Sequence, residues 1–225
     1  MSSQYHILVD NVWGSREISK AASGVVAVLT LCIASAYIAG LSFLFRYARR
    51  PQKHSKRRRV VRLRQYAPIV HIFLGASSLL VVAIAAWLLL QFHYTTIYPN
   101  VGSRAGIRLS LFAACWTFIT STAFVVVLVH PAMRRHPLAE AGPQLTWAVL
   151  TWCYWVASLA TLNRALPLLP VKTTCAGSIY CGQLRAIFAF AMMDMVTLCM
   201  SMVTLVIIVV QAWRRKRQLL QASRY

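Results

Sequence analysis

Residues 21–45 read AASGVVAVLTLCIASAYIAGLSFLF, an unbroken apolar run without a charged side chain. A helix needs about 20 mainly apolar residues to cross a bilayer, so this run predicts a transmembrane helix. Twenty residues precede it, among them Asp10, Trp13 and Glu17, and its apolar part is about twice as long as that of a signal peptide. We therefore expect this helix to be retained in the protein rather than cleaved.

Four further apolar stretches follow, at residues 67–92, 107–129, 145–162 and 186–210. Pro68 lies in the first turn of the earliest of them, where proline is tolerated because the backbone N–H it lacks would have no helical partner. The stretches are continuously apolar rather than alternating, which favours helices over barrel strands. The sequence therefore predicts an all-α integral membrane protein with five transmembrane helices.

The composition of the 225 residues supports a membrane protein. Hydrophobic residues make up 59% of the chain and charged residues 12%, whereas soluble domains average roughly half and a quarter. A chain with so little polar surface cannot cover itself in water. These proportions argue against a water-soluble enzyme, a secreted disulfide scaffold and a disordered chain.

The basic residues are distributed unevenly, and this asymmetry predicts the orientation. Of 24 Lys and Arg residues, 17 fall in the segments that five spans place on one side of the membrane, and 7 on the other. The positive-inside rule assigns the richer side to the cytoplasm, so we expect an extracytoplasmic N-terminus and a cytoplasmic C-terminus. The expected organisation is an outer segment, a first helix, a basic cytoplasmic loop, a four-helix domain and a basic cytoplasmic tail, at residues 1–20, 21–45, 46–64, 65–213 and 214–225.

The basic loop at residues 46–64 carries ten Lys and Arg residues directly beside two spans. Basic clusters in this position attract anionic lipids, at about 1 kcal/mol for each residue near the surface. The loop either only determines topology or also binds anionic lipid, and its location beside the membrane argues against a nucleic-acid partner. The candidate lipid-binding residues are Arg49, Arg50, Lys53, Lys56, Arg57, Arg58, Arg59, Arg62 and Arg64.

Two of the six cysteines lie in the loop before the last span, in PVKTTCAGSIYCGQ. The expected topology places Cys175 and Cys181 on the extracytoplasmic side of the membrane, where disulfides persist. We therefore predict a bridge between them, and two free thiols are the alternative. Two ligands without a nearby His or acidic residue are too few for a metal site. The remaining cysteines lie within spans and are expected to pack as small apolar residues: Cys32, Cys115, Cys153 and Cys199.

Catalytic patterns are missing from the sequence. The six His residues have no metal-binding spacing, and neither a phosphate-binding Gly-rich loop nor a nucleophile elbow is present. Only four carboxylate side chains exist in the chain, which leaves little material for acid–base catalysis. We therefore expect a protein that is not an enzyme and has no cofactor.

Asp194 is the exception, because it lies near the middle of the last span, in FAFAMMDMVTLCM. A carboxyl group at this depth is costly and normally faces the bundle interior, where it finds a partner. The expected partners are Arg164, Asn163, Arg108 or a hydroxyl such as that of Thr117. The carboxyl group either joins helices or belongs to a proton or cation relay.

Small residues at i and i+4 on the first span, Ser35 with Ala39 and Ala36 with Gly40, allow close helix approach. We expect them to pack within the bundle, with homo-oligomerisation as the alternative.

Trp147 is expected in an interfacial aromatic belt at the cytoplasmic boundary.

Without the first span, about residues 60–217 are expected to form a four-helix unit, which contains the segments RLRQYAP, SRAGIRLSLFAACWTFITS, TWCYWVASLATL and CAGSIYCGQLRAIFAFAMMD. With these segments the unit resembles the MARVEL domain, in particular its small fungal-type members. The additional span at residues 21–45 departs from the family pattern, in which the domain starts directly with its four helices.

The resemblance implies a non-enzymatic role in membrane apposition, in sterol- or sphingolipid-rich microdomains, or in vesicle trafficking. It implies a location in the plasma membrane or in secretory vesicles, with membrane lipids and other membrane proteins as partners. The alternative is a small transporter or channel subunit that uses Asp194.

Overall fold

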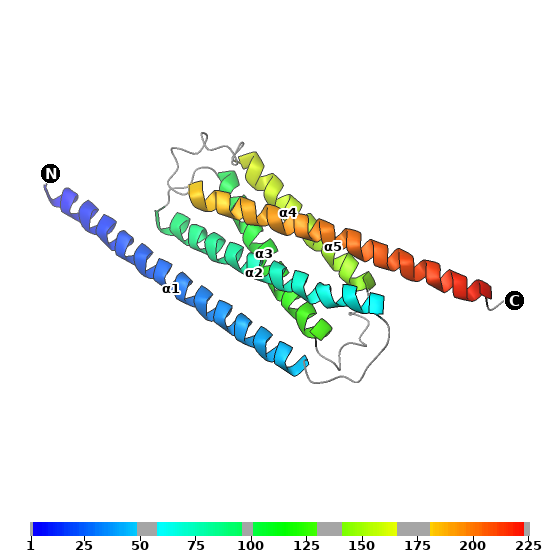
Figure 1. Ribbon diagram of the computed structural model, residues 1–225. Coiled ribbons are helices and arrows are strands. Elements are labelled where there is room, and N and C mark those ends of the chain that lie inside the picture. Colours follow the sequence, from blue (N-terminus) through cyan, green and yellow to red (C-terminus); the bar gives the residue numbers. More distant parts are fainter. Residues whose placement is uncertain (1, 49–57, 96–100, 130–140, 166–180, 223–225) are drawn as a thin grey trace.

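A computed structural model describes residues 2–48, 58–95, 101–129, 141–165 and 181–222, and all of these residues are helical (Figure 1). Each helix contains an apolar stretch long enough to cross a membrane, which confirms the prediction of an all-α protein with five such helices. The helices are α1 (Ser2–Ala48), α2 (Arg58–Thr95), α3 (Val101–Val129), α4 (Ala141–Ala165) and α5 (Cys181–Ala222). Their apolar stretches are Ser23–Leu44, Ala67–Tyr94, Gly102–Val129, Gly142–Ala165 and Cys181–Gln211.

All five helices extend beyond the predicted spans, and α1, α2 and α5 extend furthest. The first begins at Ser2, so most of the expected outer segment continues the helix; α2 begins at Arg58, inside the expected basic loop; and α5 continues to Ala222. In α5 the reason is local, because its last two turns contain Arg, Lys, Gln and Leu, which are strong helix formers, and no Gly or Pro interrupts them.

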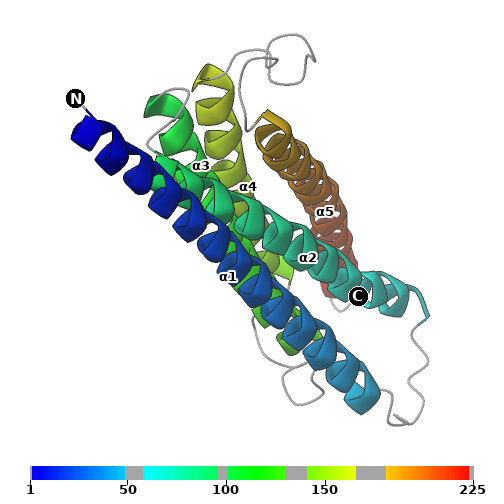
Figure 2. The same cartoon turned by 90° about the vertical axis from the view of Figure 1, so that its left-hand side faces the viewer.

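The last four helices form a closed bundle. Each packs against its neighbour in the chain, and α5 returns to pack against α2. Consecutive helices run in opposite directions, and α1 lies along the outside of α2, with a minor contact to α3 (Figures 1 and 2). The structure thus separates a four-helix bundle from a peripheral first helix.

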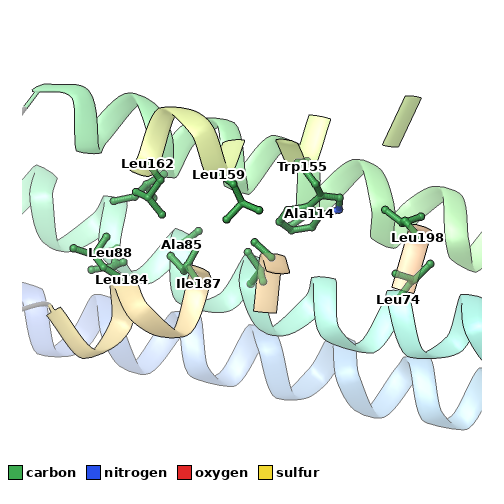
Figure 3. Packing of buried hydrophobic residues seen from close by; sticks show 14 of the residues in the cluster. Leu74, Ala85, Leu88, Ala114, Trp155, Leu159, Leu162, Leu184, Ile187 and Leu198 are labelled. Atoms are coloured by element: carbon green, nitrogen blue, oxygen red, sulfur yellow. The ribbon is translucent and has the colours of Figure 1, made fainter. Parts of the chain in front are cut away.

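The bundle core contains matched apolar residues from helices that run antiparallel. Figure 3 shows Leu88 beside Leu184 and Leu74 beside Leu198, where α2 faces α5. All four side chains are fully buried, as is Trp155 of α4. Because lipid tails are as apolar as these side chains, the stabilisation comes mainly from dense packing and interhelical hydrogen bonds rather than from removal from water.

Two glycines allow helices to approach closely. A Cβ atom built on Gly106 of α3 would lie 3.2 Å from the Cα atom of Leu162 in α4, so a larger residue would push against backbone. A Cβ atom on Gly75 of α2 would meet the Tyr37 hydroxyl of α1 and lie 3.2 Å from Ser121 Oγ of α3. These positions bring α3 close to α4, and α1 close to α2.

The first helix turns one narrow face toward the bundle. Its partly buried positions recur every three or four residues, whereas both small-residue pairs are exposed, and a Cβ atom on Gly40 would meet nothing within 4 Å. The prediction that these pairs pack within the bundle is wrong, because the close approach uses Gly75 of α2 and the ring of Tyr37 instead. The partly buried positions are Ser23, Val26, Thr30, Ala34, Tyr37, Leu41 and Leu44.

Candidate functional site

The Asp194 carboxyl group lies between α5 and α2 and is fully buried. The Ser77 hydroxyl donates a hydrogen bond to Asp194 Oδ1, and Ser78 Oγ lies 3.4 Å from Oδ2 as a second donor. Both serines are buried on the face of α2 that meets α5, one turn after the core residue Leu74. Two adjacent hydroxyl groups of α2 thus hold one carboxyl group of α5.

The partners proposed from sequence for Asp194 are not the ones it has. Arg164, Asn163 and Arg108 are all exposed, near the ends of α4 and α3. The Thr117 hydroxyl is buried, but it donates to the Ala113 carbonyl oxygen at 2.7 Å and accepts the Trp155 indole N–H at 3.1 Å. The expectation that Arg164 belongs to an intramembrane polar site is therefore wrong, because its long side chain lies at a helix end.

Apolar pairs close the α2–α5 interface on both sides of the carboxyl group. Leu74 and Leu198 lie on one side, and Ala85 and Ile187 on the other (Figure 3). Among the described residues, no hydrogen bond connects Asp194 with a polar group other than the two serines. The geometry fits a carboxyl group that joins two helices better than one step in a polar pathway.

A second polar feature, which we did not predict, joins α3 to α4. The hydroxyl groups of Ser110 and Ser158 lie 2.6 Å apart, and Trp116 Nε1 donates to Thr151 Oγ1 at 3.2 Å. On α4, Gln144, Thr151 and Ser158 are spaced by seven residues, and all are buried. On α3, Ser103, Ser110 and Thr117 have the same spacing and are also buried. Residues spaced by seven lie on the same side of a helix, so polar residues with this spacing on two consecutive helices can meet along one contact. This spacing was the sequence feature that could have revealed the contact.

Trp147 belongs to the interior of the bundle. Its side chain is 8% exposed, and its indole N–H donates to Thr120 Oγ1 at 2.8 Å. The rings of His71 and Phe124 lie 5.0 and 5.2 Å from its ring. The ring therefore fills space between α2, α3 and α4 instead of facing lipid, and its N–H has a partner there; its expected depth at the cytoplasmic boundary stays a prediction.

His71 is buried among these aromatic rings at the cytoplasmic end expected for α2. Its ring stacks on Phe124, with 5.2 Å between ring centroids, and its Nδ1 atom has no hydrogen-bond partner in the described part of the chain. No hydrogen bond among the helices as described connects it with Asp194. The two buried titratable groups of α2 and α5 are therefore separate.

Most of the candidate lipid-binding residues lie outside the described residues. Arg49, Arg50, Lys53, Lys56 and Arg57 belong to this group. The other four, Arg58, Arg59, Arg62 and Arg64, lie in the first two turns of α2, where the backbone is described but the side chains are not.

The free thiols agree in part with the expectation for the cysteines. Cys32, Cys115, Cys153 and Cys199 are free and lie within the apolar stretches; Cys115 and Cys199 are partly buried, whereas Cys32 and Cys153 are exposed and do not pack within the described protein. Cys175 lies outside the described residues, so the bridge between Cys175 and Cys181 stays a prediction.

Comparison of the chain with models of protein families, with curated proteins and with solved structures finds no match. The function proposed for this chain therefore depends on its own residues and their arrangement.

Proposed function

We propose that this chain is a non-enzymatic multi-pass membrane protein that organises membrane microdomains or takes part in vesicle trafficking. The observation that carries the proposal is the contrast between a bundle whose described core is filled and two long helices whose apolar faces are bare. None of the most apolar stretch of α1 is buried, and only 11% of that of α5. Such faces are available to lipids and to helices of other membrane proteins, or of a second copy.

We assign the four-helix unit at residues 65–213 to a MARVEL-like domain on the resemblance of its sequence segments, and the helix arrangement is compatible with such a unit. Four antiparallel helices close on one another, and the additional helix α1 stays outside this unit. The proposed role, in sterol- or sphingolipid-rich regions of the plasma membrane or of secretory vesicles, is the one that the resemblance of the sequence segments implies.

The proposed orientation has an extracytoplasmic N-terminus and a cytoplasmic C-terminus. It follows from the excess of Lys and Arg in residues 46–64 and 214–225, which would contact anionic lipid of the cytoplasmic leaflet.

The same orientation places Cys175 and Cys181 in an oxidising compartment. Mass spectrometry of the non-reduced protein should then find the peptides of these two cysteines linked, and free thiols at both positions would contradict the bridge.

Imaging of the full chain with a fluorescent tag at the C-terminus tests the organising role. We expect patches or moving vesicles that disperse when sterol or sphingolipid is depleted. Neutralising Arg57, Arg58 and Arg59 with Gln should weaken association with anionic lipid. The matched control neutralises the exposed Arg108 and Arg164 at the other end of the bundle and should leave that association unchanged.

A uniform distribution that ignores lipid depletion would contradict the organising role. Lipid association that is unchanged by the Arg57, Arg58 and Arg59 substitutions would contradict the part assigned to the basic loop.

A small transporter or channel subunit is the second candidate, and the buried Asp194 carboxyl group favours it. A carboxyl group within a span is a feature of proton and cation pathways, and here two serine hydroxyl groups are its hydrogen-bond partners. Flux of protons or cations into proteoliposomes that contain the purified chain tests this role. It predicts flux that Asp194→Asn abolishes, and normal flux in that variant, or no flux in the native chain, would exclude it.

A further inference from the structure

A shallow cavity of about 420 Å³, wide open to the outside of the protein, lies between α1, α2 and the first turn of α5. Val26, Ala27 and Leu31 line it on α1, and Ala83, Ile84 and Trp87 line it on α2. All of these residues belong to the apolar stretches that are long enough to cross a membrane. In a bilayer the opening of the cavity therefore faces lipid rather than water.

Contacts at two levels hold this space open. At one end, Trp87 Nε1 and Gln91 Nε2 donate to Ser23 Oγ at 2.9 and 3.0 Å. Further along, the Tyr37 hydroxyl donates to the Ile72 carbonyl oxygen at 3.4 Å. Between these levels the two helices bring alanines to the cavity, Ala27 from α1 and Ala83 from α2, and small side chains leave the space between the helices unfilled.

The polar groups of the cavity are uncharged. Ser23 and Gln183 line its end near the start of α5, and no charged side chain among the described residues lines it. The hydroxyl of Thr30, also in the lining, donates to the Val26 carbonyl oxygen at 2.7 Å. The Gln183 side-chain amide makes no hydrogen bond among the described residues, so it can both donate to and accept from a bound molecule.

These features define the class of ligand. The described lining suits a hydrocarbon body with one small uncharged polar group, since a phosphate or carboxylate would find no cation among these residues. The volume lies in the lower part of the range for ligand pockets, roughly 300–1,000 Å³, which suits one compact body better than a lipid with two chains.

We propose that this cavity binds a sterol-like lipid, with its hydroxyl group at Gln183 and its hydrocarbon body between α1 and α2. The proposal deepens the lipid-sorting part of the proposed function and rests on it. It gives α1 a role that the four-helix bundle lacks, because the cavity has no second wall without this helix.

Photolabelling of the full chain in liposomes that contain a photoreactive sterol tests the site. We expect label on the peptides of α1 around residues 23–31 and of α2 around residues 83–87, and excess unlabelled sterol should remove it. Ala27→Phe and Ala83→Phe fill the cavity from opposite walls and should each lower labelling at least fivefold. Ala189→Phe on the exposed face of α5 is the matched control and should label like the native chain.

Gln183→Leu tests the polar end of the cavity. Loss of one hydrogen bond should raise the sterol concentration needed for competition by about three- to tenfold. Thermal unfolding followed by Trp fluorescence establishes that each variant is folded before labelling is compared.

Label spread evenly over all five helices, or unchanged label in both folded Phe variants, would overturn the site. Equal competition by ceramide or phosphatidylcholine would overturn the choice of ligand. Localised, competable label in a protein that is uniform in cells would retain the site and remove the organising role. Patches in cells without localised label would retain the organising role and remove the site.

Discussion

The helices α1 and α2 are similarly apolar, yet they differ in how they pack. In the most apolar 18 residues of α2, 44% are buried inside the protein, whereas none are buried in α1. Hydropathy therefore identifies which residues lie in lipid and does not identify which helix has protein neighbours. In a membrane, that second property depends on small residues and on polar groups that meet across helices.

The polar side chains of α1 and α2 differ in the same way as the burial of the two helices. On α2, Ser77 and Ser78 face α5 and hold its carboxyl group. On α1, the side-chain contacts with the bundle include the Ser23 and Tyr37 hydrogen bonds and the packing of the Tyr37 ring on Phe118, with 5.5 Å between centroids. The bundle helices are thus joined by fully buried side chains, and α1 is joined to them by one partly buried face.

The largest expected effect comes from the centre of the bundle, at Trp155. This side chain is fully buried, and its indole N–H donates to Thr117. Trp155→Ala removes a large packed group and a hydrogen bond, so we expect a loss of about 3 kcal/mol in the free energy of unfolding. Titration of the purified protein from mild detergent into SDS measures it, and a loss below 1 kcal/mol would show that the α3–α4 contact is less tightly packed than described.

A slightly smaller effect is expected where α3 touches the backbone of α4. Gly106→Leu places its side chain against Leu162, so the helices must separate, at about 1–3 kcal/mol. Gly142→Leu is the matched control, because a Cβ atom there would meet nothing within 4 Å. The same SDS titration compares them, and equal losses in both variants would contradict the close approach at Gly106.

The Asp194 contact should contribute less than the packed residues. Interhelical hydrogen bonds in membranes average about 0.6 kcal/mol and reach about 1.7, so Asp194→Ala should cost on the order of 1 kcal/mol. Asp194→Asn keeps an acceptor for the serine hydroxyls and should cost under half as much. Unfolding in SDS measures both, and a larger loss for Asn than for Ala would mean that the carboxyl group itself is required.

The sequence was sufficient to predict the five spans, because length and apolar character alone decide whether a helix can cross a bilayer. The sequence was insufficient to predict the partners of Asp194. Three of the four candidates, Arg164, Asn163 and Arg108, were chosen as polar residues near helix ends. The actual partners are adjacent serines on a helix 116 and 117 residues away in the chain. The face of a helix that packs depends on neighbours, and one sequence without its contacts does not contain them.

The seven-residue spacing on α3 and α4 was readable in advance, but the small-residue pairs of α1 were misleading. Both patterns are recognised by spacing, and only the first has matching positions on the next helix: Ser110 faces Ser158, while no described residue covers Gly40. A pattern on one helix predicts a contact within the chain only when a complementary pattern exists on another.

The smallest effect is therefore expected on the exposed face of α1. Ala36→Leu adds a side chain where the described protein has no neighbour, so the free energy of unfolding should change by less than about 0.5 kcal/mol. Tyr37→Ala, on the adjacent position that contacts α2 and α3, should lower it by more than Ala36→Leu does, because it removes a ring contact and a hydrogen bond. If Ala36→Leu proves the more harmful, and its effect depends on protein concentration, then this face contacts a second copy of the chain, and α1 is peripheral only in the single chain.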